Sequence, residues 1–518
     1  MKNRYKYLTF GMLLLLSLNA CKKDYLELEP TFIIQDEQLW KDNKLIVGLL
    51  ANYYDRLPTD MGLTDQAGSQ WRNMANYDDA MWSGFSNEEG RNNIFNYDRA
   101  NWRLYDYGFV RDLNLAIENV DKFGAATLSE AQRTQLKAEF RFIRAYLYFE
   151  MVKRMGGVPL ITTQLIYDFE GDPTYLQQPR AKEAEVYDFV AAELDAIKND
   201  IGNAGSTGRA NKYTCMALKS RAMLYAGTIA KYNALLTPSI TTAGGEVGIP
   251  AARASEYFQK SLDASKEVIA GPYSLYTSNP NLGENFYEAV VKKANNPEVI
   301  FVRDFLTSKA KKHGFTYDNI ARGIREDNLS SSNITPSLNL VESYDYLDGT
   351  EGTLRTRNAA NTDFIYYDKT TDIFANKDAR LYGTVVYPGA PFKGLTVDMQ
   401  AGVMVWNAGT NAYQTVEGAD LGTNYTDNKL LVAASGPHRS IQEVSNTGFY
   451  LRKYIDANGG ASTRGIQSDV WWVWFRLGEI ELNAAEAAFE LGQTAEALLH
   501  INKIRARAGF GPNSYNAS

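Results

Sequence analysis

Cysteine and histidine are scarce in this sequence. Of 518 residues only two are cysteines, Cys21 and Cys215, and three are histidines that lie far apart in the chain. A disulfide framework needs several cysteine pairs, and a zinc site of the His-Glu-x-x-His type needs two histidines one helical turn apart. The sequence excludes both arrangements, and we expect no bound metal.

Motifs for catalysis are missing as well. Residues 389–394 have the glycine spacing of a phosphate-binding loop, but Leu395 follows where lysine is required, and no Gly-x-Ser-x-Gly elbow occurs. The carboxylate pairs at 78–79 and 88–89 are typical of solvated loop charge. A glycoside hydrolase instead holds two carboxyls about 5 to 10 Å apart across a cleft. We expect no enzymatic activity and no cofactor.

A strong charge of one sign is also absent. The formal net charge of the chain is -7, which gives no field that would attract a nucleic acid, so we expect no such partner. Hydrophobic residues make up 45% of the chain, enough for a large core, and aromatic residues make up 12%. This aromatic content suits a ligand with hydroxyl groups and flat apolar faces.

The sequence has no apolar run long enough to span a membrane, which takes about 20 residues. Its longest apolar stretch, residues 8–18, follows three basic residues and ends at Asn19-Ala20-Cys21. This pattern predicts a secretory signal peptide at 1–20, and the cysteine directly after it predicts lipid attachment at Cys21. The alternative is an ordinary signal peptide with a coincidental cysteine.

Apolar residues recur at helical spacing along much of the chain. One long helix is expected from a capping box at 127–130 to a stop at Gly156-Gly157. Others are expected at 41–56, 101–123, 186–201, 218–229, 258–269, 474–490 and 494–507. They form four helix pairs, the last of which resembles a tetratricopeptide repeat, and stacked pairs bury faces that one pair cannot cover.

Long insertions interrupt these pairs at 59–97, called here the first insertion, at 160–182 and at 273–469, called the large insertion. Short strands are expected in the large insertion at 298–305, 381–387 and 429–433. The fold class is therefore mainly α, with four tetratricopeptide-like helix pairs and long irregular insertions that contain short strands. We expect one domain over 21–518, with a scaffold at about 36–272 and 470–508 and the ligand face in the insertion.

Aromatic side chains gather in the first insertion beside hydrogen-bonding partners. Trp71 and Trp82 lie there with Arg72 and Asn73. A sugar ring stacks its C–H face on such rings and offers its hydroxyls to such donors, so we predict these residues as ligand contacts, with Tyr317 and Trp406 as contributors from the large insertion. The alternative is a small hydrophobic core under a long loop.

A second tryptophan cluster, Trp471, Trp472 and Trp474, leads into the expected helix at 474–490. We interpret it as packing and not as a site.

Longer motifs make the sequence resemble the SusD/RagB family of outer-membrane nutrient-binding lipoproteins, from Cys21 through Gly509. They are Ala-Glu-Phe-Arg-Phe-Ile-Arg-Ala-Tyr at 138–146, Gly-Gly-Val-Pro-Leu at 156–160, Asn-Pro-Glu-Val-Ile at 296–300, Asn-Lys-Asp-Ala-Arg-Leu at 376–381, Arg-Leu-Gly-Glu-Ile at 476–480 and Asn-Lys-Ile-Arg-Ala-Arg-Ala-Gly at 502–509. Their Arg, Glu and Gly residues are expected to be structural.

The resemblance implies a surface-exposed, non-enzymatic protein that is lipid-anchored in the outer membrane. It would capture an oligosaccharide and deliver it to a SusC-like TonB-dependent transporter, on which it would dock as a lid. Family members usually continue past the motif at 502–509 into a further helical stretch, whereas this chain ends at Ser518. That departure predicts a shortened C-terminus.

Two other functions stay open at this point. One is a peptide-binding or assembly scaffold of the same fold, which helix-pair repeats support through their concave surfaces. The other is an extracellular glycoside hydrolase on a helical frame, which would require a catalytic carboxylate that no motif marks.

Overall fold

The computed structural model describes residues 36–58, 78–83 and 103–512, apart from short gaps at 203–204, 237, 328–331, 439–443, 446 and 465–466. The predicted signal peptide, Cys21, Trp71, Arg72 and Asn73 lie outside the described residues. Within them, no helix has the length and apolar character needed to cross a bilayer.

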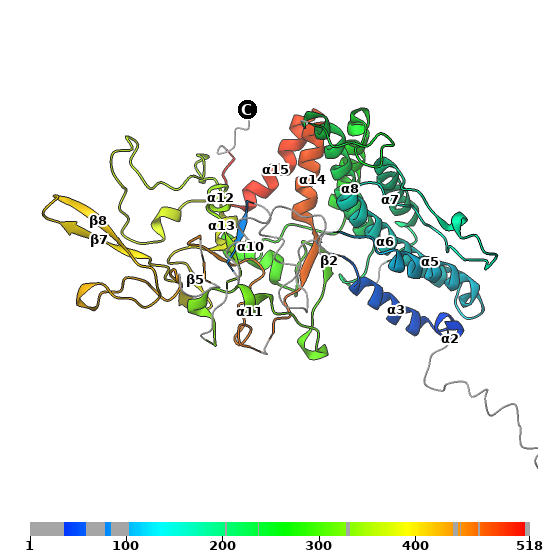
Figure 1. The fold of residues 1–518 in the computed structure, drawn as a ribbon, viewed down its shortest axis with the longest axis horizontal. Coiled ribbons are helices and arrows are strands. Elements are labelled where there is room, and N and C mark those ends of the chain that lie inside the picture. Colours follow the sequence, from blue (N-terminus) through cyan, green and yellow to red (C-terminus); the bar gives the residue numbers. More distant parts are fainter. Residues whose placement is uncertain are drawn as a thin grey trace, which may run out of the picture.

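Long helices form one side of the molecule (Figure 1). They are α3 (Asn43–Asp55), α5 (Tyr107–Lys122), α6 (Glu130–Met155), α7 (Glu183–Ile197), α8 (Lys212–Tyr232), α9 (Ala254–Ile269), α14 (Leu477–Glu490) and α15 (Thr494–Arg507), with the short α2 (Asp36–Lys41) before them. From α5 to α9 each helix packs on the next, and α14 then packs on both α9 and α15. The predicted class of stacked helix pairs is confirmed.

Helix α6 shows how local sequence sets these boundaries. Its predicted apolar stripe is buried, and Leu147 in the middle of it is 0% exposed. The helix ends where predicted, at Gly156, whose φ of 71° suits a residue without a side chain. The capping box lies two residues later than predicted, because Ser129 caps the helix and Gln132 reaches back to it.

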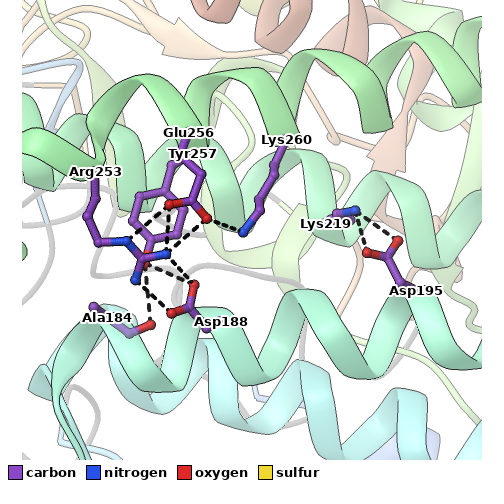
Figure 2. Close-up of polar contacts among 8 residues, drawn as sticks. All are labelled: Ala184, Asp188, Asp195, Lys219, Arg253, Glu256, Tyr257 and Lys260. Carbon is purple, nitrogen blue, oxygen red and sulfur yellow. Dashed lines mark hydrogen bonds and ion pairs between the residues drawn. The ribbon is translucent and has the colours of Figure 1, made fainter.

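Ion pairs join the polar edges of neighbouring helices (Figure 2). Arg253, at the start of α9, pairs with Asp188 of α7 at 2.7 Å, and Tyr257 donates to the same carboxylate at 3.1 Å. Lys219 of α8 pairs with Asp195 of α7 at 2.7 Å. Partly exposed pairs of this kind contribute only modest stability each, so they mainly set the register between helices that apolar packing holds together.

The large insertion folds as short helices and two-stranded antiparallel sheets beside the scaffold (Figure 1). Its helices are α10 (Leu282–Val291), α11 (Phe315–Asn319), α12 (Leu338–Glu342) and α13 (Ala379–Thr384). Its strands also pair with β1 of the first insertion and with β10, which directly precedes α14. The strand pairs are β1 (Ala80–Trp82) with β3 (Ile334–Pro336), β2 (Val299–Arg303) with β10 (Trp472–Arg476), β4 (Val385–Val386) with β9 (Tyr450–Leu451), β5 (Pro391–Phe392) with β6 (Leu395–Thr396), and β7 (Gly402–Asn407) with β8 (Ala412–Glu417).

Of the three strands predicted in the large insertion, the structure confirms one. The strand expected at 298–305 is confirmed as β2. The one expected at 381–387 is wrong for most of its length, because α13 occupies it until Thr384 and only β4 follows. The strand expected at 429–433 is also wrong, since only Leu430 there makes an isolated bridge, to Asn424.

The predicted helix at 474–490 begins three residues late, because residues 472–476 form β10 against β2. A buried ion network fixes this junction. The carboxylate of Glu298 is 0% exposed and pairs with Arg476, at 2.5 Å, and with Arg507 of α15. Burial alone would raise the pKa of Glu298, but the two guanidiniums lower it overall.

The junction network also explains why a glycine follows Arg476 and Leu477. A Cβ on Gly478 would lie 2.2 Å from the Arg476 guanidinium and 2.7 Å from the Glu298 carboxylate. The motif residues at 296–300, 476–480 and 502–509 thus meet in one place and hold the large insertion to the last helix pair.

Candidate ligand-binding site

The structure places the predicted ligand contacts at separate positions. Trp82 lies on β1, Tyr317 on α11 and Trp406 on β7. Trp71, Arg72 and Asn73 are outside the described residues, so their predicted role stays a prediction.

Trp82 belongs to the core of the insertion. It is 5% exposed, opposes Ile334 on β3, and packs in a cluster that also holds Phe315 and Ile320. A ring buried to this extent has no free face for a sugar. The prediction that Trp82 stacks on a ligand is therefore corrected in favour of the alternative, a hydrophobic core under the loop.

Tyr317 lies on the outer side of α11, where it is half-buried, whereas Phe315, Thr316 and Asn319 face inward. Just before the helix, the imidazole Nε2 of His313 lies 2.8 Å from the Val470 carbonyl. Burial lowers the pKa of His313 to about 4, so this ring is neutral at neutral pH. It anchors the start of the helix without adding charge to the surface.

One face of the Tyr317 ring is covered by a cation. The guanidinium carbon of Arg325 lies 3.6 Å from the ring centroid, and Arg325 is only 4% exposed. Arg325 in turn pairs with Asp327 at 2.9 Å. Because a cation over a ring is attracted by its π electrons, Arg325 holds the ring in place. The ring is nevertheless only half-buried.

A second arginine borders the ring. The exposed Arg464 donates from Nε to the Tyr317 hydroxyl at 2.9 Å, and its backbone N–H donates to Asp327 at 3.1 Å. Asp327 therefore connects the arginine behind the ring with the arginine at its rim. We call Tyr317, Arg325, Asp327 and Arg464 the tyrosine platform.

Glu326 clamps the loop that carries Arg464. Its carboxylate accepts hydrogen bonds from the backbone N–H groups of Gly460 and Ser462 and from the Ser462 hydroxyl, and it pairs with Lys393 at 3.2 Å. Partial burial would raise the pKa of Glu326, but these donors lower it to about 2. The loop is thus fixed while the carboxylate is ionised.

This arrangement fits recognition of a hydroxylated ring. A fixed aromatic face stacks on the C–H groups of a sugar, and guanidinium and carboxylate groups at its border can bond the hydroxyls. Because the side chains are already held by one another, little conformational freedom is lost on binding. The platform is suited to binding. No group of three or more His, Cys, Asp or Glu among the described residues is placed to hold a metal ion.

Trp406 forms a different surface. It opposes Tyr413 across the β7–β8 hairpin, with ring centroids 5.2 Å apart, and Tyr366 lies 6.1 Å from Tyr413. Trp406 is 51% exposed. Figure 1 shows this hairpin projecting away from α11, so Trp406 and Tyr317 do not share one site.

The arginines of the platform were not foreseen from the sequence. Tyr317 and Arg464 are 147 residues apart, and no local pattern predicts that they meet. The charged run Arg325-Glu326-Asp327 in a loop was the available signal.

A helical repeat scaffold that carries an irregular face with a preformed aromatic platform defines a ligand-binding protein. Two family models match the chain, the SusD family over residues 297–518 and a family described as starch-binding and associating with the outer membrane over residues 24–224. Together these two models match residues 24–224 and 297–518, and over them the chain is similar to the SusD/RagB family.

Individual relatives agree with this assignment. The SusD-like protein P38 of Formosa agariphila is 26% identical over 244 residues, which span 46% of this chain and 46% of that protein. The chain thus matches less than half the length of this relative. A crystal structure of a SusD-like protein from Bacteroides fragilis has a TM-score of 0.62 and 21% identity, and covers 93% of this chain and 82% of that one.

A third relative is a crystal structure of a protein with xylogluco-oligosaccharide. It has a TM-score of 0.52 and 15% identity, and covers 92% of this chain and 76% of that one. These structures establish the fold.

Proposed function

We propose that this protein is a surface-exposed lipoprotein that binds an oligosaccharide at the tyrosine platform and delivers it, without cleaving it, to a SusC-like TonB-dependent transporter. Residues 1–20 would be removed as a signal peptide and Cys21 would carry the lipid. The remaining chain, from residue 21 to 518, would act as one domain.

The observation that carries the proposal is the fixed, half-exposed ring of Tyr317, with a buried guanidinium 3.6 Å from its centroid and Arg464 and Asp327 at its border. The family assignment supports a carbohydrate as the ligand, as does the neighbour crystallised with xylogluco-oligosaccharide. The docking partner and the route of delivery rest on the family resemblance alone.

The first experiment is a glycan and peptide array probed with the soluble chain that starts after Cys21. We expect saturable binding to one class of oligosaccharide and to no peptide. The retained ligands should be recovered intact after long incubation. Binding to peptides only would favour the alternative scaffold function, and shortened glycans would favour a hydrolase.

The second experiment places the site. With the oligosaccharide identified by the array, Tyr317→Ala should weaken binding by about 1 to 3 kcal/mol, because it removes the stacking face, and should leave the melting temperature nearly unchanged. Tyr317→Phe keeps the ring and should retain most of the affinity. Calorimetry and thermal melts on both variants measure these effects.

Two tryptophan variants serve as controls. Trp82→Ala should cost about 3 to 5 kcal/mol of folding stability, since it empties a core position. Trp406→Ala tests the separate hairpin surface. If Trp406→Ala abolishes binding and Tyr317→Ala does not, the tyrosine platform is not the site.

A further inference from the structure

A cavity of about 300 Å³ lies where the scaffold meets β10. Its wall includes Tyr146 of α6, Tyr454, Trp472 and Trp474. Trp472 and Tyr454 pack against each other with their ring centroids 4.7 Å apart. The volume is at the lower end of the range for small-molecule pockets, and aromatic walls of this kind are common in them. Tyr317 is not part of this cavity.

The charges in the wall do not balance. Lys153 pairs with Glu150 at 2.9 Å, and Arg221 pairs with Glu479 at 2.6 Å. Arg476 also lines the cavity, and its carboxylate partner, Glu298, is outside the lining. Lys453 is a further lining cation. The wall thus carries more positive than negative groups.

Lys453 stands out among the lining cations. Its ammonium makes no hydrogen bond or ion pair with any residue in the described part of the chain, and the ring centroids of Phe286 and Tyr454 each lie 5.9 Å from it. Burial and the neighbouring Arg476 lower the pKa of Lys453 to about 8, against the opposing effect of Asp79. Lys453 is a partly buried cation without a described counter-ion, so an anion in the cavity would gain a charge-assisted contact with it.

Trp474 adds an unused donor to the same wall. The residue is 6% exposed, and its indole N–H has no acceptor among the residues that the structure describes. Two residues that line the cavity, Lys453 and Trp474, therefore each have a polar group without a described partner, and they lie beside the packed rings of Trp472 and Tyr454.

We propose that this cavity is a second binding site, separate from the tyrosine platform, for a small organic anion with a ring-shaped body, of the class of the sugar acids. The carboxylate would pair with Lys453, and the ring would lie along Trp472 and Tyr454. This inference does not depend on the function proposed for Tyr317.

The test uses D-glucuronate, D-glucose and acetate as probes, with binding to the soluble chain followed by calorimetry and ligand-observed NMR. Glucuronate should bind saturably and more tightly than the other two. Glucose lacks the charge and acetate lacks the ring. Equal binding of glucose would overturn the role of the anion, and equal binding of acetate would overturn the role of the ring.

Variants locate the site. Lys453→Met keeps the length and apolar stem of the side chain and should weaken glucuronate binding about tenfold, since one charge-assisted contact is lost. Lys309→Met removes an exposed lysine elsewhere and should have no effect. Trp474→Phe, which retains a ring but no N–H, should also weaken binding. Unchanged affinity in Lys453→Met, with an unchanged melting temperature, would refute the proposal.

The two sites can fail separately. If glucuronate does not bind but Tyr317→Ala still loses the array-identified oligosaccharide, only the cavity proposal falls. If glucuronate binding depends on Lys453 while the Tyr317 variants bind the array-identified oligosaccharide as well as the unmodified chain does, only the proposal for the tyrosine platform is refuted.

Discussion

Tyr317 depends on charges that are themselves held by other groups. Arg325 covers its ring, Asp327 joins Arg325 to Arg464, and Glu326 fixes the loop that carries Arg464. The sequence allowed Tyr317 to be named as a contact, but it could not identify these partners, because tertiary folding brings them together. For the same reason Trp82 was misjudged, since a tryptophan in a loop looks the same in sequence whether its ring faces solvent or a core.

The titration of Glu326 gives a prediction at this scale. Its pKa is lowered to about 2 in the folded chain from the ordinary glutamate value of 4.5, so its contribution to stability is present above the unfolded pKa and is lost as the pH falls toward the folded one. Glu326→Gln should therefore lower the melting temperature at pH 7. The difference from the unmodified chain should shrink between about pH 4.5 and pH 2.

Thermal melts of both chains across that pH range provide the measurement. A difference that stays constant down to pH 3 would mean that the carboxylate does not act as the clamp.

At the scale of elements, the helices were the most predictable feature. A repeat of apolar residues at spacings of three and four reports one buried helix face, and α6 follows it to within a few residues. Residues 474–476 were wrongly assigned to a helix, because the run of tryptophan, valine and phenylalanine around them has no period that separates a buried strand from a buried helix. Their partner β2 lies far away in the sequence, and pairing with it decides the outcome.

Leu147 tests the packing of α6. It is 0% exposed in the middle of the helix, so Leu147→Asp would place an unpaired charge in the main core. We expect a loss of about 4 kcal/mol or more in the free energy of unfolding, measured by urea denaturation. Ala131→Asp, at an exposed position on the same helix, is the matched control and should change stability little. Similar free energies of unfolding for the two variants would contradict the assigned helix face.

At the scale of the whole molecule, the helix pairs form a frame and the large insertion forms an irregular face beside it (Figure 1). The class of fold followed from the sequence, because repeats and their interruptions are visible in it. The grouping of Tyr317 with Arg325, Asp327 and Arg464 within that insertion did not follow from it, since the grouping depends on which loops meet.

The proposed lipid anchor gives the last prediction. Cys21→Ala should remove the lipid attachment site and shift the protein from the membrane fraction to the soluble fraction of cells. Cys215→Ala is the control, because this cysteine is buried in α8 and should not affect fractionation. Immunoblots of the separated fractions measure the result. Membrane retention of the Cys21 variant would show that the anchor lies elsewhere.

The pairing of β1 with β3 has a consequence for how the molecule folds. Ser83 and Thr335, at the end of this pair, bond through their hydroxyls at 3.1 Å although 252 residues separate them in the chain. Contacts of such high sequence separation form slowly, because a long loop must close first, whereas neighbouring helices can form early. The helical frame is therefore expected to assemble before the face that carries Tyr317. We expect local unfolding of the native protein to follow the opposite order. The face that carries Tyr317 should open first, because local unfolding begins in regions of few contacts.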